Sequence, residues 1–222
     1  SLVIVDLRLE KALKISKTLN SKYGTKVIHI EADAGMEDSL KNALSLTLKE
    51  FSKIDILING AGKNSPKPFL EIPVEEWNDV IKSQITATML GCKIFGSQML
   101  EQKRGSIINI SSASAGPPLS KAFAYSAAKA GIKNLTMNLA REWATENVRV
   151  NAIRPGFFTT EWNKKNFINP QREQAIMNHT PMKRFGEPHE LIGAAIWLAS
   201  DSSNFVTGAE ITVDGGFSCM TI

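Results

Sequence analysis

SIINISSASAGPPLSKAFAYSAAKAGIKNLTMNLAREWATENVRVNAIRPG, residues 106–156, contains the pattern on which the fold prediction rests. It begins with an apolar run at 106–110, passes through a loop into a segment of helical periodicity at 125–145, and ends with a second apolar run at 148–153. Continuous apolar runs are typical of strands buried on both faces of a parallel sheet, and such strands are joined by helices. The stretch therefore predicts a strand–helix–strand unit.

The same alternation extends toward both ends of the chain. Further strands are expected at Leu2–Val5, Lys26–Ile30, Ile54–Ile58 and Ile211–Val213, and further helices at Leu9–Leu19, Asp38–Phe51, Trp77–Met99 and Leu191–Ser200. No repeat or linker interrupts the pattern, and 222 residues suit one well-buried unit. We expect residues 1–222 to form a single α/β domain of the Rossmann-like type, with a doubly wound parallel sheet.

Composition and charge argue against several other classes of protein. The net charge is +4, and Lys and Arg are interleaved with Asp and Glu, as on solvated helix faces, so no nucleic-acid partner is expected. The two cysteines have no metal-ligand or disulfide spacing, which favours a reducing, cytoplasmic compartment and no metal. No apolar run approaches the ~20 residues that span a membrane. The first six residues are typical of a strand and not of a signal peptide.

Polar and turn residues follow several predicted strands at the point where each ends. They are Asp6, Asn59, Ser111-Ser112 and Pro155-Gly156. In an open parallel sheet the carboxyl ends of the strands meet at one edge, and ligands bind there. The sequence therefore predicts a ligand site at this edge.

Tyr125 and Lys129 lie four residues apart in the predicted helix at 125–145 and so share one face of it. A tyrosine with its ordinary pKa near 10 is a poor base at neutral pH. A lysine ammonium at ~4 Å contributes about 4 kcal/mol at an effective dielectric of ~20, which would lower the tyrosine pKa by roughly three units. The pair suits proton transfer only where it is partly buried; on a surface it is an ordinary helical neighbour pair.

Further segments favour the catalytic interpretation of this pair. They are Ile110-Ser111-Ser112, Tyr125-Ser126-Ala127-Ala128-Lys129, Val150-Asn151-Ala152-Ile153-Arg154-Pro155-Gly156, Asn59-Gly60-Ala61-Gly62, Arg184-Phe185-Gly186-Glu187-Pro188, Thr207-Gly208 and Asp214-Gly215-Gly216. This ordered set, from residue 2 to about residue 217, resembles the signature of the short-chain dehydrogenases/reductases. Details such as Arg-Pro-Gly-Phe-Phe, Asn-His-Thr-Pro-Met and Asp-Gly-Gly-Phe-Ser are similar to its sugar-acid members, the mannonate (fructuronate) and gluconate oxidoreductases.

The resemblance implies a role for each of these residues. Tyr125 would be the general acid/base, Ser112 would orient the substrate oxygen, and Lys129 would hold the nicotinamide ribose and lower the Tyr125 pKa. Asp6 would accept the adenosine ribose hydroxyls, which favours NAD over NADP because a carboxylate repels a 2′-phosphate, although Arg8 nearby leaves NADP open. The remaining cofactor contacts would come from Asp33, Asn59, Gly60, Ala61, Gly62, Ile153, Pro155, Gly156 and Thr160. For Asp6 and Asp33 a strand-end turn or helix cap stays open as the alternative.

The sequence departs from the family pattern in two places. Gln84 stands where the family usually has an asparagine that holds a water linked to the lysine; an altered relay and reduced turnover both stay open. The Gly-rich phosphate loop, which follows the family's central first strand, has no counterpart before residue 35. Without that strand its two neighbours would have unpaired ladder edges. We therefore expect the natural protein to have a preceding segment of roughly 30–40 residues, one strand–loop–helix unit.

Residues 157–190 are expected to form a substrate lid. Its cationic and amide groups suit a polyhydroxylated or carboxylated substrate, but a solvated helical hairpin explains them equally well. These groups belong to Trp162, Asn163, Lys164, Lys165, Asn166, Asn169, Arg172, Asn178 and His179.

The expected reaction is hydride transfer between NAD(H) and a secondary alcohol or ketone of a sugar acid. The alternatives are an NADPH-dependent enzyme resembling the 3-oxoacyl-carrier-protein reductases, and a catalytically weak relative that serves in binding or assembly. The resemblance also implies self-association as a tetramer or dimer through the helices at 77–99 and 125–145 and the last strand. The apolar tail Phe217–Ile222 is expected to pack against a neighbour.

Overall fold

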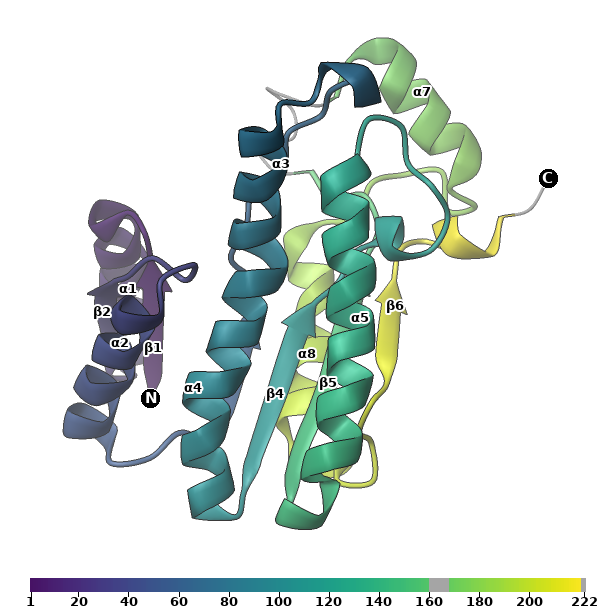
Figure 1. Cartoon of the computed structure of the whole chain (residues 1–222). Helices are drawn as coiled ribbons and strands as arrows, with labels where there is room; N and C mark the ends of the chain where they lie inside the picture. The colour runs from purple at the N-terminus through teal and green to yellow at the C-terminus, as the bar shows by residue number, and fades with distance from the viewer. Residues whose placement is uncertain (160–167, 221–222) are drawn as a thin grey trace.

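The computed structural model describes residues 1–159 and 168–220 (Figure 1). Its strands are β1 (Leu2–Asp6), β2 (Val27–Glu31), β3 (Ile56–Asn59), β4 (Gly105–Ile110), β5 (Val148–Pro155) and β6 (Glu210–Val213). Its helices are α1 (Leu9–Tyr23), α2 (Glu37–Phe51), α3 (Val74–Ile81), α4 (Ala87–Gln102), α5 (Phe123–Trp143), α7 (Pro170–His179) and α8 (Ile192–Ala199).

Every strand pairing among the described residues is parallel. β3, β4, β5 and β6 form a four-stranded sheet in that order, and β1 pairs with β2. The α/β class with a parallel, Rossmann-like sheet is therefore confirmed. Within the described ranges β1 and β3 are each paired on one side only, and the strand expected between them stays a prediction.

Apolar layers on both faces of the sheet hold it between helices. Ile107 of β4 packs in the cluster that contains Met99 of α4, and its neighbour Ile108 packs on the other face with Leu198 of α8. All four side chains are fully buried, at 0% exposure. Because alternate residues of β4 are buried on opposite faces, the strand has the continuous apolar sequence that predicted a parallel sheet. Figure 1 shows α4 and α5 on one side of the strands and α8 on the other.

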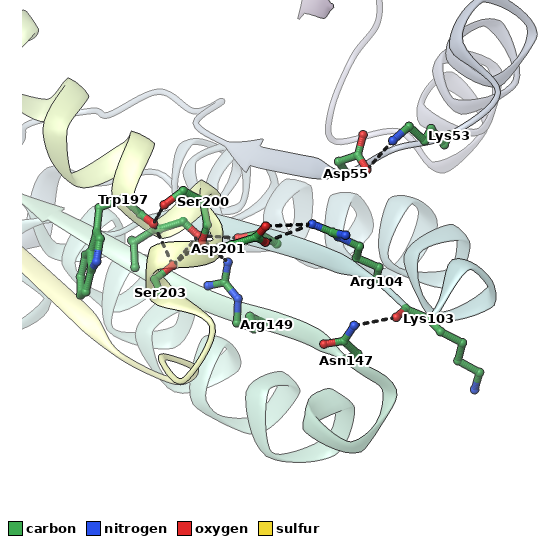
Figure 2. A network of polar contacts seen from close by, with 12 residues as sticks. Lys53, Asp55, Lys103, Arg104, Asn147, Arg149, Trp197, Ser200, Asp201 and Ser203 are labelled. Atoms are coloured by element: carbon green, nitrogen blue, oxygen red, sulfur yellow. Dashed lines mark hydrogen bonds and ion pairs between the residues drawn. The ribbon is translucent and has the colours of Figure 1, made fainter.

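A polar network joins the loops at the amino edge of the sheet (Figure 2). Arg149, near the start of β5, donates to the main-chain oxygens of Leu198 at 2.9 Å and Ser200 at 3.2 Å. Arg104 donates to Asp201 at 3.0 Å. Burial lowers the pKa of Arg149, and the nearby Asp201 carboxylate acts in the opposite direction. This edge is held by structural contacts, at the opposite end of the strands from the predicted ligand site.

The predicted helix Trp77–Met99 is the largest difference between the expected and observed elements. α3 and α4 are joined by a π-helical segment, Lys82–Thr86, so the helical run spans 74–102 and changes its hydrogen-bond register in the middle. π-helical turns occur frequently at functional sites. Apolar periodicity cannot reveal such a turn, because the apolar face continues through it.

The other predicted strands and helices are present, with ends shifted by a few residues. In the ranges that the structure describes, none of the helices has the length and apolar character needed to cross a membrane.

Candidate active site

α5 carries Tyr125 and Lys129 along the carboxyl end of β4. The Lys129 Nζ donates to the main-chain oxygen of Ile110, the last residue of β4, at 2.6 Å. Lys129 is 4% exposed, and its ammonium lies 5.5 Å from the centroid of the Tyr125 ring. The structure therefore brings these two residues together at the strand end.

The protonation of this pair differs from the sequence-based expectation. Burial raises the pKa of the Tyr125 phenol above its ordinary value, and a hydrogen bond with Ser112 acts in the opposite direction. Burial also lowers the pKa of Lys129 to about 8. The expectation that Lys129 brings the Tyr125 pKa near neutrality is therefore wrong for this structure. Its physical reason is that burial desolvates the phenol, while the Lys129 ammonium donates to the main-chain oxygen of Ile110.

Ser112 follows β4 and caps a short 3-10 turn, Ala113–Ala115. Its Oγ accepts from the main-chain N–H of Ser114 at 3.2 Å and from the Ser114 Oγ at 3.1 Å. A hydroxyl that accepts two bonds keeps its own hydrogen for a third partner, here Tyr125 or a substrate oxygen. Ser114 was missed by sequence reasoning, although Ser-x-Ser at the start of a turn is a capping signal.

Gln84 is buried in the π-helical segment and reaches the loop that follows β3. Its Nε2 donates to the main-chain oxygen of Lys63 at 2.9 Å, while its Oε1 is buried with no partner in the described part of the chain. A Cβ on Gly62 would collide with the Gln84 amide, so this loop needs glycine there. Gln84 therefore anchors the loop that contains Gly62. The predicted relay to Lys129 stays a prediction.

Asp6 and Asp33 stand after β1 and β2, and each holds a local turn with one carboxylate oxygen. Asp6 Oδ1 accepts from the main-chain N–H of Arg8, and Asp33 Oδ1 accepts from that of Gly35, both at 2.8 Å. The Arg8 Nε also lies 3.5 Å from Asp6 Oδ1. The turn role that the sequence left open is thus present at both residues. Among the described residues, the second carboxylate oxygen of each accepts no hydrogen bond and could contact a ligand.

The Asn59 side chain packs beneath the sheet edge. Its Nδ2 donates to Asn109 Oδ1 at 2.9 Å and to Cys92 Sγ at 3.4 Å, and Asn109 in turn donates to Thr136. Burial raises the pKa of the Cys92 thiol to about 12. The Asn59 amide therefore serves sheet–helix packing. Any cofactor contact of this segment would come from its main chain and from the exposed residues Gly60, Ala61 and Gly62.

Pro155 ends β5, and Gly156 follows it beside the last strand. The Gly156 N–H donates to the main-chain oxygen of Val213 at 2.9 Å, and a Cβ on Gly156 would come too close to the backbone of Asp214. Ile153, two residues earlier, is 2% exposed. The rigid turn is therefore packed in place at the carboxyl edge. The predicted cofactor residue Thr160 lies outside the described residues.

The structure describes residues 157–159 and 168–190 of the predicted lid, so its candidates at 162–166 lie outside. Asn169 caps the amino end of α7, and its side chain accepts from the main-chain N–H of Arg172 at 2.8 Å. The Arg172 guanidinium donates to Ser120 Oγ at 3.1 Å. This contact joins α7 to the loop between Ser112 and Tyr125, and Figure 1 shows α7 above that end of the sheet.

Phe217 is buried within its own chain, at 5% exposure. Its ring lies 4.7 Å from the ring of His179 and 5.1 Å from that of Phe157. The expectation that the tail packs on a neighbour is therefore wrong for Phe217, because the base of the lid covers it.

The free donors and acceptors at this edge fit the ribose hydroxyls of a dinucleotide. An ammonium has three donors, and Lys129 directs one of them to Ile110. The buried Gln84 Oε1 is an acceptor without a partner in the described residues, and Asp6 has a second oxygen available. Ribose hydroxyls both donate and accept, so this set matches them. Lys129, Asp6 and Gln84 are therefore the residues that would hold such a cofactor.

A parallel α/β sheet with a half-buried tyrosine and a buried lysine at its carboxyl edge is typical of the nicotinamide-dependent oxidoreductases. A family model described as enoyl-(acyl carrier protein) reductase matches residues 1–218. The uncharacterized oxidoreductase UxuB of Bacillus subtilis (strain 168) is 38% identical over 235 residues, which cover 96% of this chain and 84% of that protein. The chain belongs to the short-chain dehydrogenase/reductase family.

Solved structures of the same fold carry both forms of the cofactor. A gluconate 5-dehydrogenase from Burkholderia cenocepacia J2315, in complex with NADP and tartrate, has a TM-score of 0.94 at 28% identity and covers 99% of this chain and 86% of that one. A candidate D-mannonate oxidoreductase from Haemophilus influenza with bound NAD has a TM-score of 0.93 at 33% identity, with the same coverage.

Proposed function

We propose that this chain transfers a hydride between NAD(H) and a secondary alcohol or ketone of a sugar acid, with Tyr125 as the general acid/base. The observation that carries the proposal is the placement of the Tyr125 ring 5.5 Å from the buried ammonium of Lys129, with Ser112 close enough to lower the Tyr125 pKa. The sugar-acid class is supported by relatives named as acting on gluconate and D-mannonate.

The nicotinamide ring, when bound, donates or accepts the hydride. In the direction of ketone reduction, Tyr125 gives its phenolic proton to the oxygen that gains negative charge. The Ser112 hydroxyl donates a hydrogen bond to the same oxygen, because its own lone pairs are occupied by Ser114. Lys129 supplies a buried cation that stabilises the phenolate left on Tyr125. In alcohol oxidation the same groups act in reverse.

NAD is proposed as the preferred cofactor because Asp6 presents a carboxylate at the end of β1. Arg8 lies against Asp6 Oδ1 and offers a cation to a 2′-phosphate, so NADP is the second candidate. Solved structures of related proteins contain either NADP or NAD, so the proposed preference for NAD rests on the charge of Asp6 alone.

An absorbance assay of NADH and NADPH with purified protein tests the proposal. The panel would contain aldonates, ketouronates and a 3-oxoacyl thioester, the last because the family model's description names an acyl-carrier reductase. Turnover of an aldonate or ketouronate supports the proposal. Turnover of only the thioester with NADPH would replace it with the reductase alternative. No turnover and no cofactor binding would favour the binding or assembly alternative.

Self-association through α4 and α5 is part of the proposal. An apolar groove lies between these helices and is lined by Met89, Cys92, Lys93, Ser97, Leu100, Leu135, Leu139, Glu142 and Trp143. Sedimentation analysis of the protein and of a Met89→Glu variant tests it. A lower oligomer for the variant is expected, and a monomeric parent protein would contradict the proposal.

The lid is proposed to cover the substrate from the side of α7. Arg172 ties α7 to Ser120, in the loop that precedes the catalytic helix. An Arg172→Ala variant would then raise KM more than it lowers kcat, and an unchanged KM would favour the hairpin alternative.

A further inference from the structure

Arg154, near the carboxyl end of β5, and Glu210, the first residue of β6, form a largely buried ion pair. The Arg154 Nη1 lies 3.3 Å from Glu210 Oε2, and both side chains are 11% exposed. Lys133 of α5 approaches the same oxygen, with its Nζ at 3.6 Å. A buried ion pair is often no more stabilising than apolar side chains of similar volume. We therefore expect this ion pair to affect function through its contacts with the neighbouring backbone, and not through the free energy of unfolding.

Both chain neighbours of Ser112 are bonded to this ion pair. The Ser111 Oγ donates to Glu210 Oε1 at 2.6 Å. The Arg154 Nη2 donates to the main-chain oxygen of Ala113 at 3.3 Å. Ser112 is thus held from the residue before it by the carboxylate and from the residue after it by the guanidinium.

The turn that follows Ser112 packs directly on the guanidinium. A Cβ on Gly116 would collide with the Arg154 Nη2, so a larger residue there would displace this guanidinium. Within the turn the Ala115 N–H donates to the Ser112 main-chain oxygen at 2.9 Å, and the Gly116 N–H to that of Ala113 at 3.3 Å. Arg154 is therefore a platform for the turn that Ser112 caps.

We propose that the Glu210–Arg154 ion pair positions the Ser112 hydroxyl by fixing the main chain on both sides of it. This inference rests on the proposed role of Ser112 in the reaction. Neither residue touches the reacting atoms; each acts through Ser111 or Ala113. Three neighbouring strands are linked in this way, since Ser111 follows β4, Arg154 lies near the carboxyl end of β5 and Glu210 begins β6.

The expected kinetic consequence follows from how hydrogen-bond catalysis depends on position. A displacement of about 1 Å can cost on the order of 100-fold in rate. Loss of the ion pair would leave the substrate pocket and the cofactor contacts of Lys129 and Asp6 in place. We therefore expect kcat to fall at least about ten-fold while KM and the cofactor Kd change less than about two-fold.

The test compares Arg154→Met and Glu210→Gln with the control Arg149→Met. Arg149 is an arginine of the same strand that also donates to main-chain oxygens, but at the amino edge of the sheet (Figure 2). Glu210→Gln keeps the shape and an acceptor for Ser111, so it tests the ion pair even if Arg154→Met fails to fold. Hydrogen exchange of the amides of residues 114–116 is measured beside kcat, KM and cofactor Kd.

Faster exchange at these amides in both test variants, with a lower kcat and an unchanged KM, is the expected result. Arg149→Met should reduce stability with kcat unchanged. The positioning role is overturned if exchange stays protected in Glu210→Gln, or if Arg149→Met lowers kcat equally. Hydrogen exchange needs no substrate. An inactive parent protein would contradict the proposed function, but the exchange rates of these amides would still test the positioning role.

Discussion

The ammonium of Lys129 donates to the main-chain oxygen of Ile110 at 2.6 Å, which fixes a buried cation at the carboxyl end of β4. Burial lowers the pKa of Lys129 to about 8 from its ordinary 10.5. The folded chain therefore holds this proton less tightly than the unfolded chain does. Folding must consequently desolvate a cation at neutral pH, and this cost disappears in alkali.

The first prediction concerns the stability of the protein against pH. The pKa of Lys129 is lower in the folded chain than in the unfolded chain. The stability that the neutral amine provides is therefore fully present above the unfolded pKa and is lost as pH falls toward about 8. The free energy of unfolding should thus rise between about pH 8 and pH 10, by up to about 3 kcal/mol. Lys129→Met should abolish the rise. Urea unfolding across this range checks it, and parallel curves for the two proteins would contradict it.

Tyr125 has the opposite effect at higher pH. Burial raises its pKa, so the stability that the neutral phenol provides is present below pH 10 and is lost above it. The window for the Lys129 measurement therefore ends near pH 10.

The second prediction concerns the rate of alcohol oxidation. Tyr125 must be ionised to accept the substrate proton, and burial raises its pKa, so kcat should increase with pH through the alkaline range. Tyr125→Phe should lower kcat by roughly 100-fold to 10,000-fold with cofactor binding retained. Tyr23→Phe is the matched control, since Tyr23 is the other tyrosine of the chain and is 62% exposed. Full turnover by Tyr125→Phe would remove it from the mechanism.

The third prediction concerns the choice between NAD and NADP. Asp6→Ser removes the carboxylate that opposes a 2′-phosphate and frees the Arg8 guanidinium from its contact with Asp6. The ratio of kcat/KM for NAD to that for NADP should fall at least about ten-fold. Asp38→Ser removes a charge at an exposed position of α2 and should leave the ratio unchanged. An equal ratio in Asp6→Ser and the parent protein would mean that Asp6 serves only the local turn.

The fourth prediction concerns the reactivity of the two cysteines. Cys92 is 1% exposed and its thiol pKa is raised to about 12, while Cys219 is exposed. A thiolate is the reactive form, so a thiol reagent at about pH 8 should modify Cys219 alone in the native protein. Both should react after unfolding in urea. Mass spectrometry of the labelled peptides distinguishes them, and native labelling of Cys92 would show that the α4 packing opens readily.

The strand pattern and the strand-end residues could be predicted because both follow from local rules. β4 has a continuous apolar sequence, and parallel strands end at one edge, so Ser112 and Pro155 were placed correctly at that edge. The direction of the Tyr125 pKa could not be predicted. Spacing shows that Lys129 shares its helix face, but only the packed structure shows that burial raises the pKa of the Tyr125 phenol.

The ion pair between Arg154 and Glu210 was also not predicted from the sequence. Each is a charged residue in or beside an apolar strand run, which signals a buried partner. The sequence could not say that the two meet, because Glu210 lies 56 residues after Arg154 and pairing depends on the order of strands in the sheet. The role predicted for Gln84 stays a prediction, and its partner Lys63 lies in a loop whose path has no sequence signature.

The last prediction concerns Gln84 as an anchor of the cofactor loop. Gln84→Met removes the bond from Nε2 to the Lys63 main-chain oxygen and also removes the buried, unpartnered Oε1. These effects on stability oppose each other, so the free energy of unfolding should change by no more than about 1 kcal/mol. The loop that contains Gly62 would lose its anchor, and the Kd for NADH should rise several-fold in a fluorescence titration.

Gln102→Met is the matched control for this variant. Gln102 also lies in the helical run 74–102, and it exchanges hydrogen bonds of 2.7 Å and 3.0 Å with the main chain of Ile54 at the amino end of β3. The amino end of β3 is remote from the carboxyl edge. Loss of the Gln102 hydrogen bonds should therefore lower the free energy of unfolding and leave the Kd for NADH unchanged. If both variants weaken NADH binding equally, the effect comes from loosening of β3 as a whole, and Gln84 has no particular role at the cofactor loop.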